Sequence, residues 1–254
     1  MPTRINLAAD LGEGFGAYTM GDDAAMLEVV SSANVACGFH AGDPRIMNRT
    51  VRRCVENGVD IGAHPGFPDL AGFGRRAIDC TPDEVYTDVL YQLGALAAFV
   101  RANGARLTHL SPHGKLGNLT RKRSDYADAV ASAVADFDPA LRIVTREGGL
   151  TDAAQKRGLA CGFSGFADRA YGDDGELVPR HVPGAVIHDR DQVIARAIRM
   201  VTEKVVRTVS GKDVPVRCDT ILLHGDTAGA VELARGVRRA FDDAGIAVEG
   251  LGSR

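Results

Sequence analysis

Short apolar segments alternate with longer amphipathic segments along the whole chain. The short segments have the length and composition of buried strands, and glycine or polar residues bound most of them. Ile246–Val248 is a candidate for one further strand at the end of the chain. The other predicted strands are Ile5–Ala9, Asn34–Cys37, Val59–Gly62, Leu107–Leu110, Leu141–Val144, Leu159–Gly162 and Thr220–Leu223.

The amphipathic segments predict helices, and their ends carry the expected punctuation. Thr81 can cap the helix that begins at Pro82, where proline suits the first helical position. Four predicted helices are followed by a glycine that leads into an apolar segment: Gly58, Gly104, Gly158 and Gly245. Glycine is favoured there because the residue that ends a helix often adopts the left-handed backbone conformation. The predicted helices are Asp22–Ser31, Pro44–Asn57, Pro82–Asn103, Asp125–Asp136, Leu150–Arg157, Arg190–Val209 and Ala228–Ala244.

Strands that alternate with helices at this spacing predict a parallel sheet. Seven or eight repeats in 254 residues favour a closed β/α barrel over an open doubly wound sheet. The glycine-rich turn of dinucleotide-binding open sheets is absent after the first strand. We therefore predict one α/β domain, residues 1–254, folded as a barrel. The stretch Gly162–Arg190 has no helical periodicity. A loop of this length is uncommon in a compact domain unless it has a function, so we expect a functional role for it.

Composition narrows the classes of function. The formal net charge is −3, and the longest basic run is Arg121-Lys122-Arg123, which we interpret as a solvated turn before a helix. We expect no nucleic-acid partner. The five cysteines are scattered without a Cys-x-x-Cys pair, so reduced thiols are the simplest interpretation. No apolar run approaches about 18 residues and no signal-peptide core precedes the first strand, which predicts a cytoplasmic protein without a membrane span.

Polar motifs follow the predicted strands at their carboxyl ends, where parallel α/β proteins bind ligands. Four of the seven histidines stand in such motifs beside a Gly, Ala or Pro, whereas His109, His181 and His188 lack this context. We interpret those three as structural or surface residues. The candidate catalytic residues are Asp10, Glu13, His40, His64, His113, Asp168 and His224.

Imidazoles and carboxylates in one pocket can transfer protons or hold a divalent metal that activates water. A metal site built from separate strand ends would use Asp10, His40 and His64, although no tight metal-binding spacing such as His-Glu-x-x-His is present. The sequence also lacks a Gly-x-Ser-x-Gly elbow and a Walker-type phosphate loop. Nucleotide chemistry would therefore be unorthodox or supplied by a partner.

The strand-end motifs together resemble the LamB/YcsF family, which supplies the A component of bacterial ATP-dependent 5-oxoprolinases. The resemblance covers essentially the whole chain, and its longest motif, Ser32–Asp43, is very specific. Further matching segments are Ala9–Gly14, Ile61–Asp69, Gly72–Arg76, Pro112–Gly114, Phe166–Tyr171, Leu177–Arg180 and Leu223–Asp226.

This resemblance implies a seven-stranded, deacetylase-like β/α barrel. It implies cleavage of the 5-oxoproline lactam to L-glutamate, with ATP as co-substrate, in a complex with B and C subunits. Phosphorylation of the amide oxygen would remove the resonance that protects a lactam, and histidine or aspartate in the barrel would then supply the base. Arg169 would hold a phosphate or a carboxylate. The substrate-binding candidates are Asn34, Asp43, Lys115, Arg169 and Asp226, of which Asp43 also fits a helix cap.

Two segments depart from the family pattern. The family's Asp-Leu-Asn on the first strand is Asn6-Leu7-Ala8 here. The family's Lys-Pro-His-Gly-Ala-Leu-Tyr-Asn is Ser111-Pro-His-Gly-Lys-Leu-Gly-Asn118, and Lys115 is a candidate to return the missing ammonium group. The departures keep two alternatives open: a stand-alone metal-dependent amide hydrolase or deacetylase, and a divergent paralogue that binds a ligand without turnover.

Overall fold

Seven parallel strands form a closed barrel in the computed structural model, which describes residues 3–223, 225 and 229–253. Each strand pairs with the next in the order given below, and β1 pairs with β9 from Asn6 against Thr220 to close the barrel. The strands are β1 (Arg4–Leu11), β2 (Ser32–Ala36), β3 (Asp60–His64), β4 (Leu107–Leu110), β5 (Arg142–Thr145), β6 (Cys161–Gly165) and β9 (Thr220–Leu223). The predicted closed β/α barrel is confirmed.

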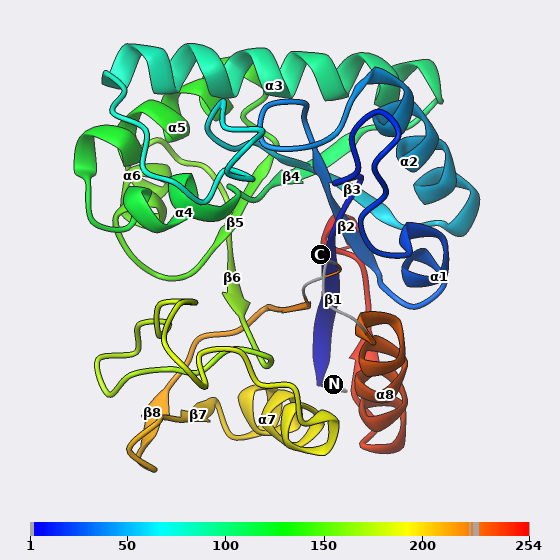
Figure 1. Ribbon diagram of the computed structural model, residues 1–254, viewed down its shortest axis with the longest axis vertical. Coiled ribbons are helices and arrows are strands. Elements are labelled where there is room, and N and C mark those ends of the chain that lie inside the picture. The colour runs from blue at the N-terminus through cyan, green and yellow to red at the C-terminus, as the bar shows by residue number, and fades with distance from the viewer. Residues whose placement is uncertain (1–2, 224, 226–228, 254) are drawn as a thin grey trace.

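Helices surround this barrel, with α3 and α5 packed side by side along one flank and α7 and α8 at the opposite end of Figure 1. Every residue of β2 is buried, and so is every residue of β1 after Arg4. This burial explains the near-continuous apolar runs of the strands. The helices are α1 (Asp23–Leu27), α2 (Pro44–Asn57), α3 (Pro82–Ala102), α4 (Gly114–Thr120), α5 (Ser124–Phe137), α6 (Gly149–Lys156), α7 (Arg190–Thr202) and α8 (Ala230–Asp243).

The predicted glycine ends are confirmed. Gly58, Gly104, Gly158 and Gly245 all have φ between 65° and 74°, in the left-handed region that glycine adopts without strain. The cap at Thr81 is also present: its side chain accepts from the Glu84 backbone N–H while the Glu84 carboxylate accepts from Thr81 N–H.

The predicted helix Arg190–Val209 is too long. α7 ends at Thr202, and Lys204 takes a left-handed φ of 59° before the strand β7 (Val205–Arg207) begins. β7 forms an antiparallel ribbon with β8 (Asp213–Pro215), because the valines at 205 and 206 suit a strand better than a helix. The short helix α4 was not predicted.

The candidate last strand is present as β10 (Ala247–Val248), which extends the sheet beside the start of β1 and stands outside the closed ring. A short 3₁₀ turn, Leu251–Ser253, follows it. Among the described helices, none combines the length and the apolar character needed to cross a membrane.

Candidate active site

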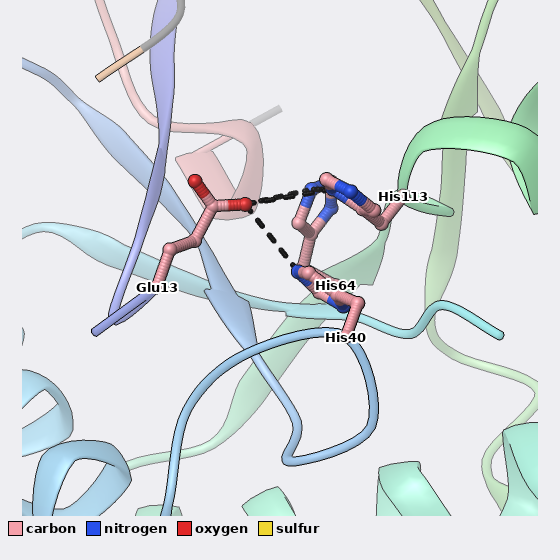
Figure 2. A group of neighbouring side chains, drawn as sticks. All are labelled: Glu13, His40, His64 and His113. Atoms are coloured by element: carbon pink, nitrogen blue, oxygen red, sulfur yellow. Dashed lines mark hydrogen bonds and ion pairs between the residues drawn. The ribbon is translucent and has the colours of Figure 1, made fainter. Parts of the chain in front are cut away.

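Four buried side chains meet at the carboxyl ends of the first four strands (Figure 2). Glu13 lies in the loop after β1 and His40 in the loop after β2, while His64 is the last residue of β3. His113 stands at the N-cap of α4, just after β4. One ligand atom from each of the four lies within 4.8 Å of all the others. We refer to these residues as the Glu–His cluster.

Two of the three imidazole rings of the cluster stack face to face, and the third packs edge-on against both. His40 and His113 stack with their centroids 3.7 Å apart and an interplanar angle of 4°. His64 stands nearly perpendicular to both rings. Gly74 makes room for this stack, since a Cβ there would lie 2.8 Å from both His40 Cβ and His113 Cδ2.

Main-chain carbonyls fix the tautomers of two of these rings. His64 Nδ1–H donates to the Ser111 carbonyl at 2.6 Å, and His113 Nε2–H donates to the Phe73 carbonyl at 2.8 Å. The remaining nitrogens, His64 Nε2 and His113 Nδ1, face each other at 2.9 Å. In neutral rings both of these atoms carry lone pairs, so a proton or a cation must lie between them.

Glu13 supplies the negative charge beside these nitrogens. Its Oε1 lies 3.3 Å from His40 Nε2, 3.5 Å from His113 Nδ1 and 4.0 Å from His64 Nε2. Burial, together with the neighbouring His113, His64 and Arg75, lowers the pKa of His40 well below its usual value. The His40 ring is therefore neutral, and it lies beside the Glu13 carboxylate.

The turn that orients His113 is strained. Phe73 is one of two non-glycine residues with positive φ among the described residues, at 53°. Its carbonyl accepts from His113, and its ring packs edge-on against His40 and His113 at centroid distances of 5.7 and 5.1 Å. Such strain persists only where the surroundings hold it, and it commonly marks functional sites. Phe73 lies in one of the family-like segments but was not among the predicted site residues.

A second polar layer lies behind the cluster. Asp10 Oδ1 stands 3.5 Å from His64 Nε2 and accepts a hydrogen bond from Asn34 Nδ2 at 2.8 Å. Asn34 Oδ1 in turn accepts from His109 Nε2 at 2.8 Å, and Thr108 Oγ1 donates to His109 Nδ1. Asn34 thus positions Asp10 and is not among the residues that line the cavity described below, so its predicted substrate contact stays a prediction. His109 is structural, as expected, but it supports the site from below.

A cavity of about 890 Å³ opens above the cluster. Asp10, Glu13, His64 and His113 line its floor. The long loop between β6 and α7 forms much of its wall and contributes Phe166, Arg169, Gly172, Asp174, Glu176, Leu177, Val178, Pro179, Arg180 and His181. The functional role expected for this loop from its length is consistent with that position.

Two of the predicted substrate-binding residues line the cavity, Lys115 and Arg169. Arg169 is 6% exposed, and two main-chain carbonyls, those of Ala185 and Val178, accept its hydrogen bonds. Burial and the nearby Arg180 lower the pKa of Arg169 to about 10, so the guanidinium keeps its charge at neutral pH. Its adjacent Asp168 is also buried.

The other predicted site residues lie elsewhere or cannot be placed. Asp43 caps α2: its Oδ1 accepts from Arg45 and Ile46 N–H, and its Oδ2 accepts from Gly16 N–H. It is not among the residues that line the cavity. His224 and Asp226 fall outside the described residues. Of the predicted metal triad, His40 and His64 belong to the Glu–His cluster, in which Glu13 and His113 stand in the place expected for Asp10.

The interpretation of the basic triplet as a solvated turn is wrong for Arg121. Its side chain is 14% exposed and lines the cavity, because the turn after α4 folds toward the long loop. Arg146, which follows β5, lines the same wall. Arg146 was missed although it follows a strand as the predicted residues do, because an arginine after a strand carries no signature without a motif around it.

A carboxylate and imidazoles thus gather at the carboxyl ends of the strands of a closed parallel barrel, and the fold of this barrel is deacetylase-like. A T48 deacetylase shares this fold, with a TM-score of 0.53 at 15% identity over 98% of this chain and 89% of that one. The profile of the LamB/YcsF family matches residues 5–254. The chain belongs to the LamB/YcsF family, as the motifs of its sequence indicated.

Two relatives are similar along their full length. The A subunit of 5-oxoprolinase from Gluconobacter oxydans (strain 621H) is 52% identical over 248 residues, which cover 97% of this chain and 98% of the relative. The crystal structure of a lactam utilization protein from Thermus thermophilus matches with a TM-score of 0.93 at 45% identity. That match covers 97% of this chain and 99% of the other.

Proposed function

We propose that this chain is the A component of a cytoplasmic, ATP-dependent 5-oxoprolinase that cleaves the 5-oxoproline lactam to L-glutamate together with B and C subunits. The observation that carries the proposal is the Glu–His cluster on the floor of a cavity that Arg169 and Lys115 also line. The names of the full-length relatives, a component of 5-oxoprolinase and a lactam utilization protein, support the substrate class.

The chemistry requires an activated amide. Transfer of the γ-phosphoryl group of ATP to the lactam oxygen gives a cyclic imidate phosphate and ADP. Water then adds to the former carbonyl carbon, the ring C–N bond breaks as the nitrogen takes a proton, and an acyl phosphate remains. A second water releases inorganic phosphate and leaves glutamate. Two waters are consumed, and each addition needs a group that accepts a proton from water.

The Glu–His cluster provides that group. His64 and His113 face each other through nitrogens whose other ring N–H is already committed to a main-chain carbonyl, so one proton can be held between them. Glu13 stabilises the protonated pair from 3.5 Å, and Asp10 does so from the His64 side. Asp168 and His224 remain proposed catalytic residues. Arg169 is suited to the substrate carboxylate, and Lys115 and Asp226 stay proposed binding residues.

The same four side chains fit a divalent metal in place of the shared proton. The donor set of three imidazoles and one carboxylate is the type that zinc and similar ions prefer, and all four residues are buried. The neutral His40 ring presents Nε2 to the cluster, 3.3 Å from Glu13 Oε1, whereas its Nδ1 has no hydrogen-bond partner among the described residues. When bound, such an ion would lower the pKa of a water molecule and place positive charge at the floor of the cavity. Glu13, His40, His64 and His113 would hold it.

ATP use is assigned to the partners in this proposal. The sequence has no Walker-type phosphate loop, so the phosphoryl transfer belongs to the B and C subunits and the ring opening to this chain. The full complex is therefore the unit to assay. Co-expression of this chain with the genes beside it, followed by measurement of glutamate and ADP from 5-oxoproline, is the direct test.

Variants sharpen this test. His64→Ala removes the ring that faces His113 and is expected to lower the rate of glutamate release at least a hundredfold, within the range of general acid–base contributions. His188→Ala, at an exposed position outside the cavity lining, is the matched control and should keep full activity. A complex that releases no glutamate from 5-oxoproline with wild-type chain present would contradict the proposal.

The Glu–His cluster also favours a second candidate, a stand-alone metal-dependent amide hydrolase or deacetylase. It predicts that the isolated chain, loaded with zinc or manganese, hydrolyses an amide without ATP or partners, and loses metal and activity together in His40→Ala. A third outcome, binding of 5-oxoproline without turnover even in the complete complex, would indicate a ligand-binding paralogue.

A further inference from the structure

The cavity above the Glu–His cluster carries more positive charge than the proposed role of Arg169 needs. Seven lysine and arginine side chains line it against four carboxylates. 5-Oxoproline has a single carboxylate, and one buried guanidinium is enough to hold it. Two of the seven cations, Arg121 and Arg146, lie together at one place.

Arg121 and Arg146 converge on one acid, Glu176. Arg121 Nη1 donates to Glu176 Oε2 at 2.8 Å, and Arg146 Nη2 donates to the same oxygen at 3.0 Å. The two guanidinium side chains are 14% and 11% exposed, so solvent screens their charges weakly. One carboxylate therefore faces two largely buried cations, and the group keeps a net positive charge.

Main-chain carbonyls around the pair accept hydrogen bonds from both arginines. Arg121 Nε donates to the Glu147 carbonyl, and Arg146 Nη1 donates to the Gly175 carbonyl. Gly148 lets the chain approach Arg121 closely, since a Cβ there would lie 3.1 Å from Arg121 Nε. Burial and the neighbouring Arg146 both lower the pKa of Arg121, which shows the electrostatic cost of keeping the two cations together.

Glu176 lies in a tight turn and is more exposed than the two arginines. The turn between Tyr171 and Leu177 is closed by the hydrogen bond from Gly172 N–H to the Glu176 carbonyl, and the Glu176 side chain is 33% exposed. An anion that reaches the arginines from the cavity competes with a partly solvated carboxylate, not with a buried one.

We infer that Arg121 and Arg146 form a subsite for a phosphoryl group carried by a small cyclic-amide substrate, and that Glu176 is the internal counter-ion that this group displaces. The inference rests on the proposed function and deepens it: the ligand that enters this chain is the phosphorylated lactam, with its carboxylate on Arg169. A phosphoryl dianion matches the charge of two guanidiniums and offers several oxygens to their fork-shaped donors, which a single carboxylate oxygen cannot.

Inorganic phosphate is the probe, titrated into the isolated full-length chain by isothermal calorimetry at constant ionic strength. Phosphate is expected to bind saturably, and acetate at least tenfold more weakly. Glu176→Gln removes the counter-ion but keeps the shape of the side chain, and should tighten phosphate binding about tenfold. Arg121→Gln and Arg146→Gln should each weaken it tenfold or more. Arg157→Gln, at a position whose side chain pairs with Asp128, is the control and should bind as wild type does.

Thermal unfolding checks that each variant is folded, and Arg146→Lys provides a second variant that keeps the charge but loses the two-donor geometry. Arg146→Lys should weaken phosphate binding less than Arg146→Gln. Unchanged or weaker binding in Glu176→Gln, or unchanged binding in both glutamine variants of the arginines, overturns the subsite. Tighter binding of ADP than of phosphate through the same arginines overturns the assignment to a phosphorylated small molecule.

These outcomes are separable from those of the proposed function. The titration needs neither partners nor 5-oxoproline. If phosphate behaves as expected while the complex fails to release glutamate, the phosphoryl subsite stands and only its assignment to a phosphorylated lactam falls with the proposed function. Conversely, an active complex whose Arg121 and Arg146 variants bind phosphate like wild type keeps the proposed function and rejects the subsite.

Discussion

The buried His109 should make the fold sensitive to mild acid. Its ring is fully enclosed behind the cluster, where it donates to Asn34 and accepts from Thr108. Burial, with smaller contributions from His64 and Arg142, lowers its pKa from 6.5 to about 3. The folded state therefore binds this proton less readily than the unfolded state does. The stability associated with the neutral ring is complete above about pH 6.5 and is lost as the pH falls toward 3.

The size of the effect follows from the two pKa values. At pH 5 the unfolded chain has protonated this histidine almost completely and the folded chain has not. The difference lowers the free energy of unfolding by about 2 kcal/mol between pH 7 and pH 5, at about 1.36 kcal/mol per pKa unit. His109→Gln keeps a side-chain amide that can donate to Asn34 and does not titrate, so this share of the acid sensitivity should disappear.

Urea unfolding at pH 7 and pH 5, followed by circular dichroism, measures the effect. The wild type and the exposed control His188→Gln should lose about 2 kcal/mol more than His109→Gln over this interval. Titration of other groups, the neutral His40 included, is common to all three proteins and cancels in the comparison. An equal loss in His109→Gln and wild type would refute the assignment of the acid sensitivity to this ring.

Four further predictions concern the site and its supports. Glu13→Gln should lower zinc affinity at least tenfold, measured by competition with a chelator, since it removes the charged donor of the cluster; unchanged affinity would count against this donor set. Phe73→Ala should slow glutamate release by the complex about tenfold while the chain stays folded, because the His113 acceptor loses its packing; unchanged kinetics would show that the turn is only structural. Thr81→Ala removes the cap of α3 and should cost about 1 kcal/mol of unfolding free energy without changing activity, by urea unfolding and the same assay. Ser111→Lys combined with Lys115→Ala should preserve or improve activity if Lys115 supplies the ammonium group of this pocket, and an inactive but folded double variant would reject that idea.

The barrel could be predicted from the sequence because its signals are local. Strands buried on both faces read as short apolar runs, and Gly58, Gly104, Gly158 and Gly245 mark the helix ends. The α7 boundary was wrong because helical periodicity continues in the sequence past Lys204, and only the left-handed turn there ends it. α4 is short and begins at Gly114, so neither its length nor its first residue signals a helix.

The site was predictable to the extent that it follows strand ends. Glu13, His40, His64 and His113 were all expected to meet, and their distances place them together. The direction in which each strand-end side chain points could not be predicted. Whether a strand-end side chain enters the cavity or caps a helix depends on a turn of the main chain, and Asp43 turned to the N-terminus of α2. The Arg121 and Arg146 pair was hidden for the same reason, since its acid Glu176 comes from a distant loop.

The departure at Ser111 leaves the cluster intact for a structural reason. The atom that orients His64 is the main-chain carbonyl of Ser111, an acceptor that any residue at this position provides. The Ser111 side chain is therefore uncoupled from the tautomer of His64, and a change from the family's lysine alters the lining of the cavity without releasing the ring. Asn34 is the opposite case. Its amide donates to Asp10 through Nδ2 and accepts from His109 through Oδ1, so a side chain that lacks either the donor or the acceptor would lose one of these two partners. Substitutions in the polar layer should thus affect the geometry of the cluster, whereas those at Ser111 should affect which substrate enters.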